Sequence, residues 1–338
     1  MSRPTSSESG QRIIVAAFGG NSVTRATERG TYAEQLANVR VMCEEVLPLV
    51  RAGHRVVIIH GNGPQVGSLA LQAEAGKALG VPDQPFDVLA AMTQGQIGYL
   101  IQQTLGNLLR EDRAESLGDG RSALDDAPPV ASVVTQVLVD PADPAFQHPT
   151  KPIGPFYDQE LAQSLAAEKG WTVVQDADRG WRRVVPSPQP IEVIEAAAIR
   201  ALIAAGSIVV AGGGGGVPVM RDPTGGLRGV EAVIDKDLAA EKLAALVGAD
   251  TLLLITGVHR IGLDYGTPNQ RFLDMITLDE ARRYLAEGQF PAGSMGPKVQ
   301  AAIRFLEDGG TEAIVTAPEV LAAALRGTDG TRIVRTPS

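Results

Sequence analysis

Short, continuously apolar segments alternate along the chain with segments of helical periodicity, and glycines follow several of them. Short apolar runs bounded by turn residues are typical of strands that are buried on both faces. The pattern therefore predicts buried strands at residues 13–18, 56–59, 207–210, 251–255 and 313–315.

Between the first two predicted strands, apolar residues keep the spacing of one helical face. They are Leu36, Val39, Cys43, Val46 and Val50, which follow one another at steps of 3, 4, 3 and 4. This stripe predicts a helix over about 31–52, and Gly53 supplies its end. Cys43 lies on the stripe, so we interpret it as a packing residue and not as a nucleophile. Strands that alternate with helices favour an α/β fold with a parallel sheet covered on both faces.

Residues 140–190 differ in composition from the rest of the chain. They hold 8 of the 22 prolines and both tryptophans. Apolar and aromatic residues persist between these prolines, so a small, separately folded, lid-like subdomain is favoured over a flexible linker. We expect residues 11–335 to form a single domain that includes this lid, after a disordered polar tail over residues 1–10.

Three of the predicted strands end in glycine-rich turns, at residues 19–20, 61–63 and 212–216. A glycine turn between a strand and a helix lets backbone N–H groups converge on an anion, and the helix N-terminus adds partial positive charge. Ligands collect at the carboxyl ends of parallel strands, so the turns predict an anion or phosphate site at one edge of the sheet. None of the turns matches a Walker A motif or a clean dinucleotide fingerprint, which disfavours P-loop and nicotinamide-dependent enzymes.

Charge and cysteine content narrow the class of protein. The net charge of −9 disfavours a nucleic-acid-binding or anionic-membrane-binding surface. A single cysteine excludes an internal disulfide framework and a cysteine-rich metal cluster. No apolar run approaches the roughly 18 to 20 residues of a membrane span, and the Ser-rich start lacks the apolar core of a signal peptide. We expect a soluble, cytoplasmic protein that acts on small molecules, not on nucleic acid or membranes.

Lysine is scarce, which makes its positions informative. Lys151, Lys236 and Lys298 lie in proline- and glycine-rich or carboxylate-flanked contexts. Taken singly, each is most simply a surface lysine. Phosphoryl transfer, however, needs positive charge around the moving group and its leaving oxygen.

Longer motifs occur in order along the chain. They are Phe18-Gly-Gly-Asn, His60-Gly-Asn-Gly-Pro-Gln-Val-Gly, Met92-Thr-Gln-Gly-Gln-Ile-Gly-Tyr, Val134-Thr-Gln-Val, Pro149-Thr-Lys-Pro-Ile-Gly-Pro-Phe, Gly229-Val-Glu-Ala-Val-Ile-Asp-Lys-Asp and Gly293-Ser-Met-Gly-Pro-Lys. This series resembles carbamate kinase, within the amino-acid-kinase superfamily, from about residue 12 to 335. The resemblance implies a three-layer αβα sandwich, usually a homodimer, with the carbamoyl-phosphate side in the N-terminal half and the nucleotide side at about 205–335. It also implies Mg2+-dependent phosphoryl transfer between ATP and carbamate, with the metal carried mainly by nucleotide phosphates and water, not by a protein metal site.

The resemblance further implies roles for individual residues. Lys151 reaches in from the subdomain, Lys236 and Lys298 flank the β- and γ-phosphates, and Asp237 orients the lysines. Substrate-binding positions are implied at Gly19, Gly20, Asn21, Gly61, Asn62, Gly63, Gly213 and Gly214. Nucleotide-binding positions are implied at Thr256, Val258, His259, Tyr265, Met295, Gly296 and Pro297. Residues 17–21 hold no lysine, where many amino-acid kinases carry one, and Lys151 is implied to substitute for it.

The sequence supports separate predictions for two histidines, His60 and His259. His60 precedes the second glycine turn, and we expect it to bond the turn backbone, because transfer to an already anionic carbamate requires no general base. After strand 251–255 the family loop typically reads Thr-(Gly/Asp)-Val-Asp, whereas this chain has Thr256-Gly-Val-His-Arg. We expect this loop to border the nucleotide with raised positive charge; a solvated loop tip without consequence is the alternative.

Two other functions stay open. One is a kinase of the same fold whose acceptor is another small carboxylate or carbamate-like acid. The other is a catalytically silent homologue that senses nucleotide or carbamoyl phosphate. Retention of Lys151, Lys236, Asp237 and Lys298 argues against the silent homologue.

Overall fold

A computed structural model describes residues 10–336 except 26, 118–126, 176–179 and 292. The predicted N-terminal tail therefore lies, apart from Gly10, outside the described residues. The helices are α1 (Tyr32–Arg51), α2 (Gly63–Lys77), α3 (Phe86–Leu117), α4 (Gln159–Lys169), α5 (Ala196–Ala204), α6 (Lys236–Val247), α7 (Leu278–Ala286), α8 (Met295–Glu307) and α9 (Leu321–Leu325).

The strands fall into one large and three small sheets. The large sheet contains β1 (Ile13–Phe18), β2 (Arg55–His60), β3 (Val130–Ser132), β9 (Ile208–Val210), β12 (Thr251–Ile255), β15 (Met275–Thr277), β16 (Glu312–Thr316) and β17 (Thr331–Val334). The small sheets contain β4 (Gln136–Leu138), β8 (Glu192–Val193), β10 (Val217–Arg221) and β11 (Leu227–Gly229); β13 (Gly262–Leu263) and β14 (Arg271–Phe272); and β5 (Lys151–Tyr157), β6 (Thr172–Gln175) and β7 (Trp181–Val185).

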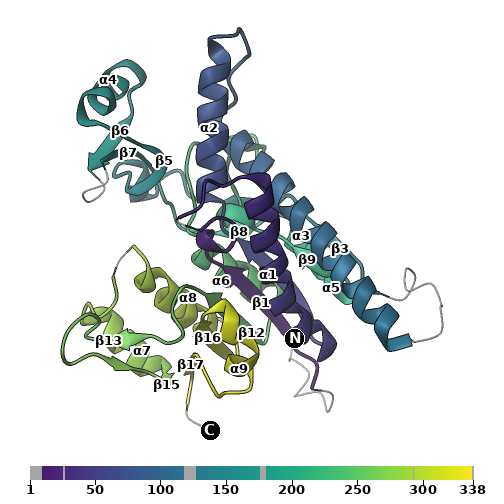
Figure 1. Cartoon of the computed structure of the whole chain (residues 1–338). Helices are drawn as coiled ribbons and strands as arrows, with labels where there is room; N and C mark the ends of the chain where they lie inside the picture. The colour runs from purple at the N-terminus through teal and green to yellow at the C-terminus, as the bar shows by residue number, and fades with distance from the viewer. Residues whose placement is uncertain (1–9, 26, 118–126, 176–179, 292, 337–338) are drawn as a thin grey trace.

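The large sheet has the order β15-β17-β16-β12-β1-β2-β9-β3 and is parallel except between β16 and β17. Along β1, Ile14, Ala16 and Phe18 pack in the core that includes α1 and α3. Val15 and Ala17 pack in the opposite core, which includes α6 and α8. Because successive side chains of a strand point to opposite faces, this division makes three layers, and Figure 1 shows α1 and α3 running along the sheet. The predicted αβα architecture is confirmed.

Helix α1 agrees with the predicted apolar stripe. Thr31 and Glu34 form a capping box at its N-terminus, and Gly53 has a φ of 81° just beyond its end. Cys43 is fully buried in the core, and burial raises the pKa of its thiol to about 12. A buried thiol of this kind is not a reactive nucleophile, so the interpretation of Cys43 as a packing residue is confirmed.

The sheet β5-β7-β6 and helix α4 form a small unit over residues 151–185, which we call the lid. In Figure 1 it projects at the upper left beside α2, away from the large sheet. Residues 140–150, which the sequence groups with this unit, contain a short 3-10 turn, Pro144–Phe146, and no lid strand. Within the described residues, no helix is both long and apolar enough to cross a membrane.

Candidate active site

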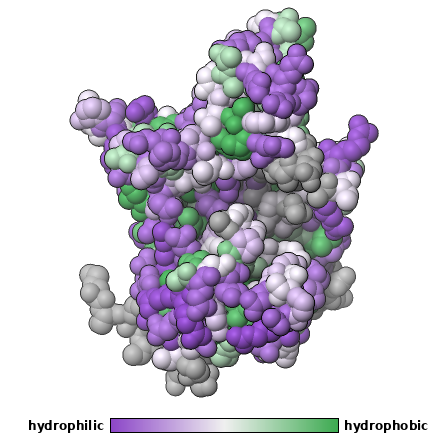
Figure 2. Space-filling model, turned by 90° about the vertical axis from the view of Figure 1, so that its left-hand side faces the viewer, coloured by the Kyte–Doolittle hydropathy of each residue, from purple (hydrophilic) through white to green (hydrophobic). Residues whose placement is uncertain are grey.

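The three glycine turns meet because their strands are neighbours in the large sheet. Phe18 pairs with His60 across β1 and β2, and Ile58 pairs with Val210 across β2 and β9. The turns after these residues open into a cleft of about 720 Å³. The cleft also borders the lid and the first turns of α6 and α8. Figure 2, which views the side of the molecule that carries the lid, shows a hollow between the upper and lower parts.

Close packing at the turns explains why they consist of glycine. A Cβ on Gly61 would lie 2.6 Å from the Cα of Gly20. A Cβ on Gly213 would lie 2.4 Å from the His60 ring, and one on Gly214 would lie 2.3 Å from the Asn62 side chain. Distances below 3.0 Å are not found for real Cβ atoms, so these positions require glycine if the turns are to stay together.

Polar side chains of α3, together with Thr135 between β3 and β4, fix the backbone of the turns. Gln94 donates to the carbonyls of Thr135 and Gly213, both at 3.1 Å, and accepts from the Thr135 N–H at 2.7 Å. The Thr135 hydroxyl accepts from the Gly212 N–H at 2.9 Å. Asn62 donates to the Thr93 hydroxyl at 2.8 Å. These bonds hold the second and third glycine turns in a defined relative position.

His60 is buried beneath the turns. Its Nδ1 lies 3.1 Å from the Gly61 carbonyl oxygen, and burial lowers its pKa to about 4. A neutral imidazole at physiological pH fits the expected contact with the turn backbone. His60 is also absent from the residues that line the cleft.

Asp237 forms ion pairs with two lysines at the cleft. Its Oδ1 lies 2.6 Å from the Nζ of Lys236, and its Oδ2 lies 2.6 Å from the Nζ of Lys298. Asp237 and Lys298 are buried, at 4% and 7% exposure. Burial by itself raises the pKa of Asp237, but Lys236 and Lys298 bring that pKa below its usual range. Burial and the charge of Lys236 lower the pKa of Lys298, against the attraction of Asp237.

Lys151 approaches the same place from the lid. It is the first residue of β5, and its Nζ lies 3.0 Å from the Oδ2 of Asp235. Asp235 caps α6, whose first two residues are Lys236 and Asp237. Three lysines and two aspartates therefore carry one net positive charge at one end of the cleft.

Helix N-termini add partial positive charge to the cleft. Helix α2 begins at Gly63 and α8 at Met295, and neither N-cap side chain bonds to its own helix. The N–H of Gly296 in α8 already donates to the Pro291 carbonyl at 2.9 Å, and Pro64 and Pro297 have no N–H. The two helix ends therefore contribute chiefly through their partial positive charge. The cleft can surround a phosphorylated ligand with ammonium groups and with this partial charge.

Most of the substrate-side and lysine predictions lie together. The predicted residues that line the cleft are Gly19, Gly20, Gly61, Asn62, Gly63, Lys151, Gly214, Lys236, Asp237, Thr256 and Lys298. Asn21 lies between the cleft-lining residues Gly20 and Ser22, and Gly213 is buried against His60. Met295, Gly296 and Pro297 form the first turn of α8, directly before Lys298, and do not themselves line the cleft.

The remaining nucleotide-side predictions do not line the cleft. They are Val258, His259 and Tyr265. His259 contacts Glu319 at 3.2 Å and Asp329 at 3.5 Å, and only Glu319 borders the cleft. Tyr265 is 62% exposed on the loop after β13.

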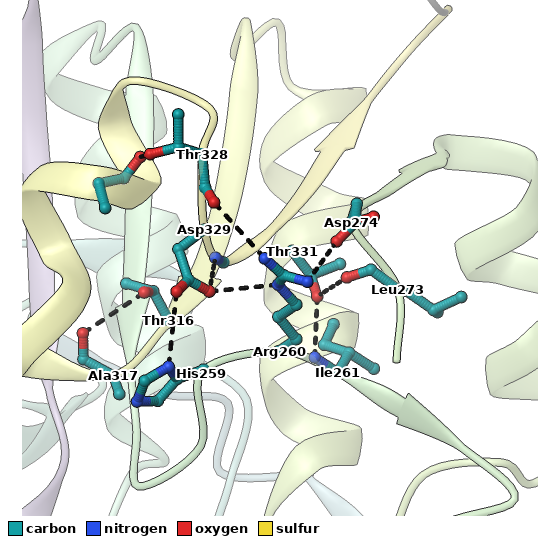
Figure 3. Close-up of polar contacts among 12 residues, drawn as sticks. His259, Arg260, Ile261, Leu273, Asp274, Thr316, Ala317, Thr328, Asp329 and Thr331 are labelled. Carbon is teal, nitrogen blue, oxygen red and sulfur yellow. Dashed lines mark hydrogen bonds and ion pairs between the residues drawn. The ribbon is translucent and has the colours of Figure 1, made fainter. Parts of the chain in front are cut away.

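Carboxylates offset the positive charge that the sequence suggests at the loop after β12. Arg260 contacts Asp274 at 2.8 Å and Asp329 at 3.2 Å. Figure 3 shows Asp329 between His259 and Arg260, joining the loop to the segment before β17. The expectation of excess positive charge here is wrong, because acidic residues distant in sequence fold against both side chains.

Sequence reasoning missed several residues of the site. Gln94, Thr93 and Thr135 lie within motifs that carry the resemblance, but the motifs alone do not indicate which groups these side chains bond. Asp235 precedes the Lys-Asp pair directly, and its contact with Lys151 joins residues 84 positions apart. The only sequence signal for Asp235 was its place in Val-Ile-Asp-Lys-Asp.

Comparisons with known proteins identify the family of the chain. The amino acid kinase family matches residues 12–317, and the chain belongs to this family. The chain is 52% identical over 324 residues to the carbamate kinase of Thermococcus kodakarensis, covering 95% of this chain and 99% of the relative. It is 50% identical to the carbamate kinase of Pyrococcus horikoshii, covering 96% and 99% of the two chains. Its fold is similar to that of carbamate kinase from Giardia lamblia bound to AMP-PNP, with a TM-score of 0.87, 40% identity, and 96% and 99% coverage.

Proposed function

We propose that this protein is a carbamate kinase, a phosphotransferase that interconverts ADP and carbamoyl phosphate with ATP and carbamate. The observation that carries the proposal is the group of Lys151, Lys236 and Lys298 around Asp235 and Asp237, in a cleft bordered by glycine turns. Identities of 50% and 52% to carbamate kinases over nearly the whole chain support the same activity.

The cleft supplies what phosphoryl transfer requires. In the direction of ATP synthesis, the bond between phosphorus and the carbamoyl oxygen breaks, and a bond forms to a terminal β-phosphate oxygen of ADP. Carbamate leaves as an anion and, after taking a proton from water, decomposes to CO2 and NH3. Charge spreads over the equatorial oxygens in the transition state, where Lys151, Lys236 and Lys298 would stabilise it. The backbone N–H groups of the turns at Gly19–Gly20 and Gly61–Gly63 would hold the carbamoyl phosphate.

The reaction needs no proton acceptor, because both the leaving carbamate and the attacking phosphate oxygen are anionic. Consistently, His60 has its pKa lowered to about 4 by burial and lies beneath the turns. Asp237 is engaged by two ammonium groups at 2.6 Å. We assign His60 to holding the turn and Asp237 to orienting Lys236 and Lys298.

The donors at the cleft fit Mg2+ bound chiefly through the nucleotide. Mg2+ prefers oxygen ligands and commonly binds through one or two carboxylates together with phosphates and water. Asp235 and Asp237 are the carboxylates beside the lysines, and each already contacts an ammonium group. The metal would therefore be held by the phosphates of ATP or ADP and by water, where it would neutralise phosphate charge.

We further propose that the protein is a cytoplasmic homodimer. Helix α3 carries Val88, Met92 and Tyr99 at 37%, 46% and 55% exposure. Because they are spaced by four and seven residues, they lie on one face of the helix. This exposed apolar face is suited to contact with a second copy of the chain. Light scattering on the parent and on Met92→Asp tests this assignment: a dimer that becomes a monomer supports it, and a monomeric parent contradicts it.

A coupled assay tests the activity. Purified protein with ADP, Mg2+ and carbamoyl phosphate is expected to produce ATP, and EDTA is expected to stop the reaction. Acetyl phosphate in place of carbamoyl phosphate tests the other acceptor. Faster turnover of acetyl phosphate would favour a kinase for another carboxylate, and ADP binding without turnover of any acyl phosphate would favour the silent homologue.

A further inference from the structure

Asp235 lies between the lid and helix α6 and contacts both. Its Oδ2 accepts from the Nζ of Lys151 at 3.0 Å, and its Oδ1 accepts from the backbone N–H of Asp237 at 2.9 Å. One carboxylate therefore ties the lysine at the start of β5 to the N-terminus of the helix that carries Lys236 and Asp237.

The segment that carries Asp235 is itself firmly placed. Val233 donates its N–H to the Pro186 carbonyl at 2.9 Å, where the chain leaves the lid. Lys151 pairs with Val185 in the lid sheet, so both connections of the lid lie beside this segment. Ile234 is 1% exposed, and a Cβ on Gly215 would lie 2.2 Å from the Ile234 carbonyl oxygen. The segment therefore also packs against the third glycine turn.

We propose that Asp235 is a positioning residue for phosphoryl transfer, which holds the ammonium group of Lys151 at the cleft in register with Lys236 and Lys298. This inference rests on the proposed function. An ammonium group has three N–H donors, so Lys151 can keep its bond to Asp235 and still donate to a phosphoryl group. Lys151 has a long, flexible stem, and its side chain is 36% exposed to solvent even with the ion pair formed. Without Asp235 the position of its Nζ would spread over many rotamers.

The capping role and the positioning role of Asp235 are separable by substitution. Asn and Asp are nearly equivalent as N-caps, so Asp235→Asn keeps the cap of α6 and the size of the side chain. It removes only the negative charge that holds Lys151. Asp158 is a matched control, because it caps α4 in the lid by accepting from the Leu161 N–H at 2.8 Å.

The experiment measures ATP formation by Asp235→Asn in the parent and in a Lys151→Ala background. We expect kcat to fall by about 10- to 100-fold in the parent background, because misplacing a group by about 1 Å can cost about 10²-fold. The KM for ADP is expected to stay unchanged. In the Lys151→Ala background the same substitution is expected to have no further effect, and Asp158→Asn is expected to keep the parental kcat.

Two kinetic results would overturn the proposal: a parental kcat for Asp235→Asn, or an equal loss of kcat with and without Lys151. Hydrogen exchange of β5 and β7 supplies a measurement that does not depend on activity. Asp235→Asn is expected to accelerate exchange there when Lys151 is present and to add nothing when it is absent. A parent without ATP formation would refute the proposed function, while the exchange measurement would still decide whether Asp235 holds Lys151.

Discussion

Lys298 and Asp237 form an ion pair in the interior, with Nζ and Oδ2 separated by 2.6 Å. The other carboxylate oxygen of Asp237 holds Lys236 at the same distance. A single negative charge thus keeps two ammonium groups side by side at the N-terminus of α6. Without a ligand, this arrangement has an excess of positive charge, which is suited to receiving phosphate.

Asp237→Asn is expected to destabilise the protein strongly. Removing one partner of a buried ion pair typically costs about 3–5 kcal/mol, because the other charge is left uncompensated. Burial and the charge of Lys236 lower the pKa of Lys298 against the attraction of Asp237, so the loss of that attraction should lower the folded-state pKa of Lys298 further. The lost stability should therefore return as the pH rises from about 7 toward about 10, where lysine loses its proton.

Denaturant unfolding at several pH values measures this effect. Asp279→Asn is the control, since Asp279 is 88% exposed and its ion pair with Arg282 lies at the surface; it should change stability little. If Asp237→Asn were as stable as the control at neutral pH, the ion-pair account of the cleft would be wrong.

Glu241→Gln is expected to stabilise the protein at alkaline pH. Burial, together with the Asp308 carboxylate, raises the pKa of Glu241 to about 7, against the attraction of Lys242. A carboxyl group with a raised folded-state pKa favours folding at low pH, and this contribution is lost as the pH rises from about 4.5 to about 7. The glutamine variant avoids that loss, so it should be more stable than the parent by up to about 3 kcal/mol at pH 8 and similar to it near pH 4.5.

Thermal unfolding of parent and Glu241→Gln at these two pH values supplies the comparison. Glu287→Gln is the control, because Glu287 is 50% exposed. A constant difference in stability between the two pH values would contradict the burial of a titrating carboxyl group at Glu241.

Gly61→Ala is expected to separate the first two glycine turns. Its Cβ would lie 2.6 Å from the Cα of Gly20, whereas a Cβ on Gly63 would meet nothing within 4 Å. Overpacking of this kind typically costs about 1–3 kcal/mol. Gly63→Ala adds alanine to the first turn of α2 and should leave stability unchanged or raised. Equal melting temperatures for the two variants would show that the close approach of the turns is not required.

His259→Asp is expected to weaken ADP binding. His259 contacts Glu319, which lines the cleft, at 3.2 Å, and it contacts Asp329 at 3.5 Å. An aspartate at this position would place a third carboxylate beside these two. Because ADP is anionic, the added negative charge beside the cleft should reduce its affinity.

Calorimetry of ADP binding to the parent and to His259→Asp tests this prediction. A surface ion pair contributes about 1 kcal/mol at most, so the change expected in the dissociation constant is at most about fivefold. Equal dissociation constants for the two proteins would mean that the loop after β12 has no influence on the nucleotide.

The chain pattern predicts the parts of the fold that depend on local sequence. The strand at residues 13–18 and the helix near 31–52 follow from apolar spacing, and both occur as β1 and α1. The meeting of the glycine turns follows from parallel strands that end at one edge. The strands of two or three residues in the sheet β11-β10-β4-β8 escape this reasoning, since so few residues show no periodicity.

Contacts between segments that are distant in sequence could not be predicted either. His259 lies 60 residues from Glu319, and Lys151 lies 84 from Asp235. Such pairs form only when the whole sheet assembles, so no local pattern indicates that His259 faces carboxylates or that Asp235 holds the lid lysine.

The most direct test of the account is the rate of ATP formation by Lys151→Ala under saturating ADP, Mg2+ and carbamoyl phosphate. Loss of one preorganised charged group typically costs about 2.7–4 kcal/mol in transition-state stabilisation. The account predicts that the rate falls by about 10²–10³-fold while the melting temperature stays near that of the parent. Lys77→Ala, a change of an exposed lysine in α2, should keep the parental rate. A Lys151→Ala rate equal to that of the Lys77 control would contradict the assignment of the lid lysine to catalysis.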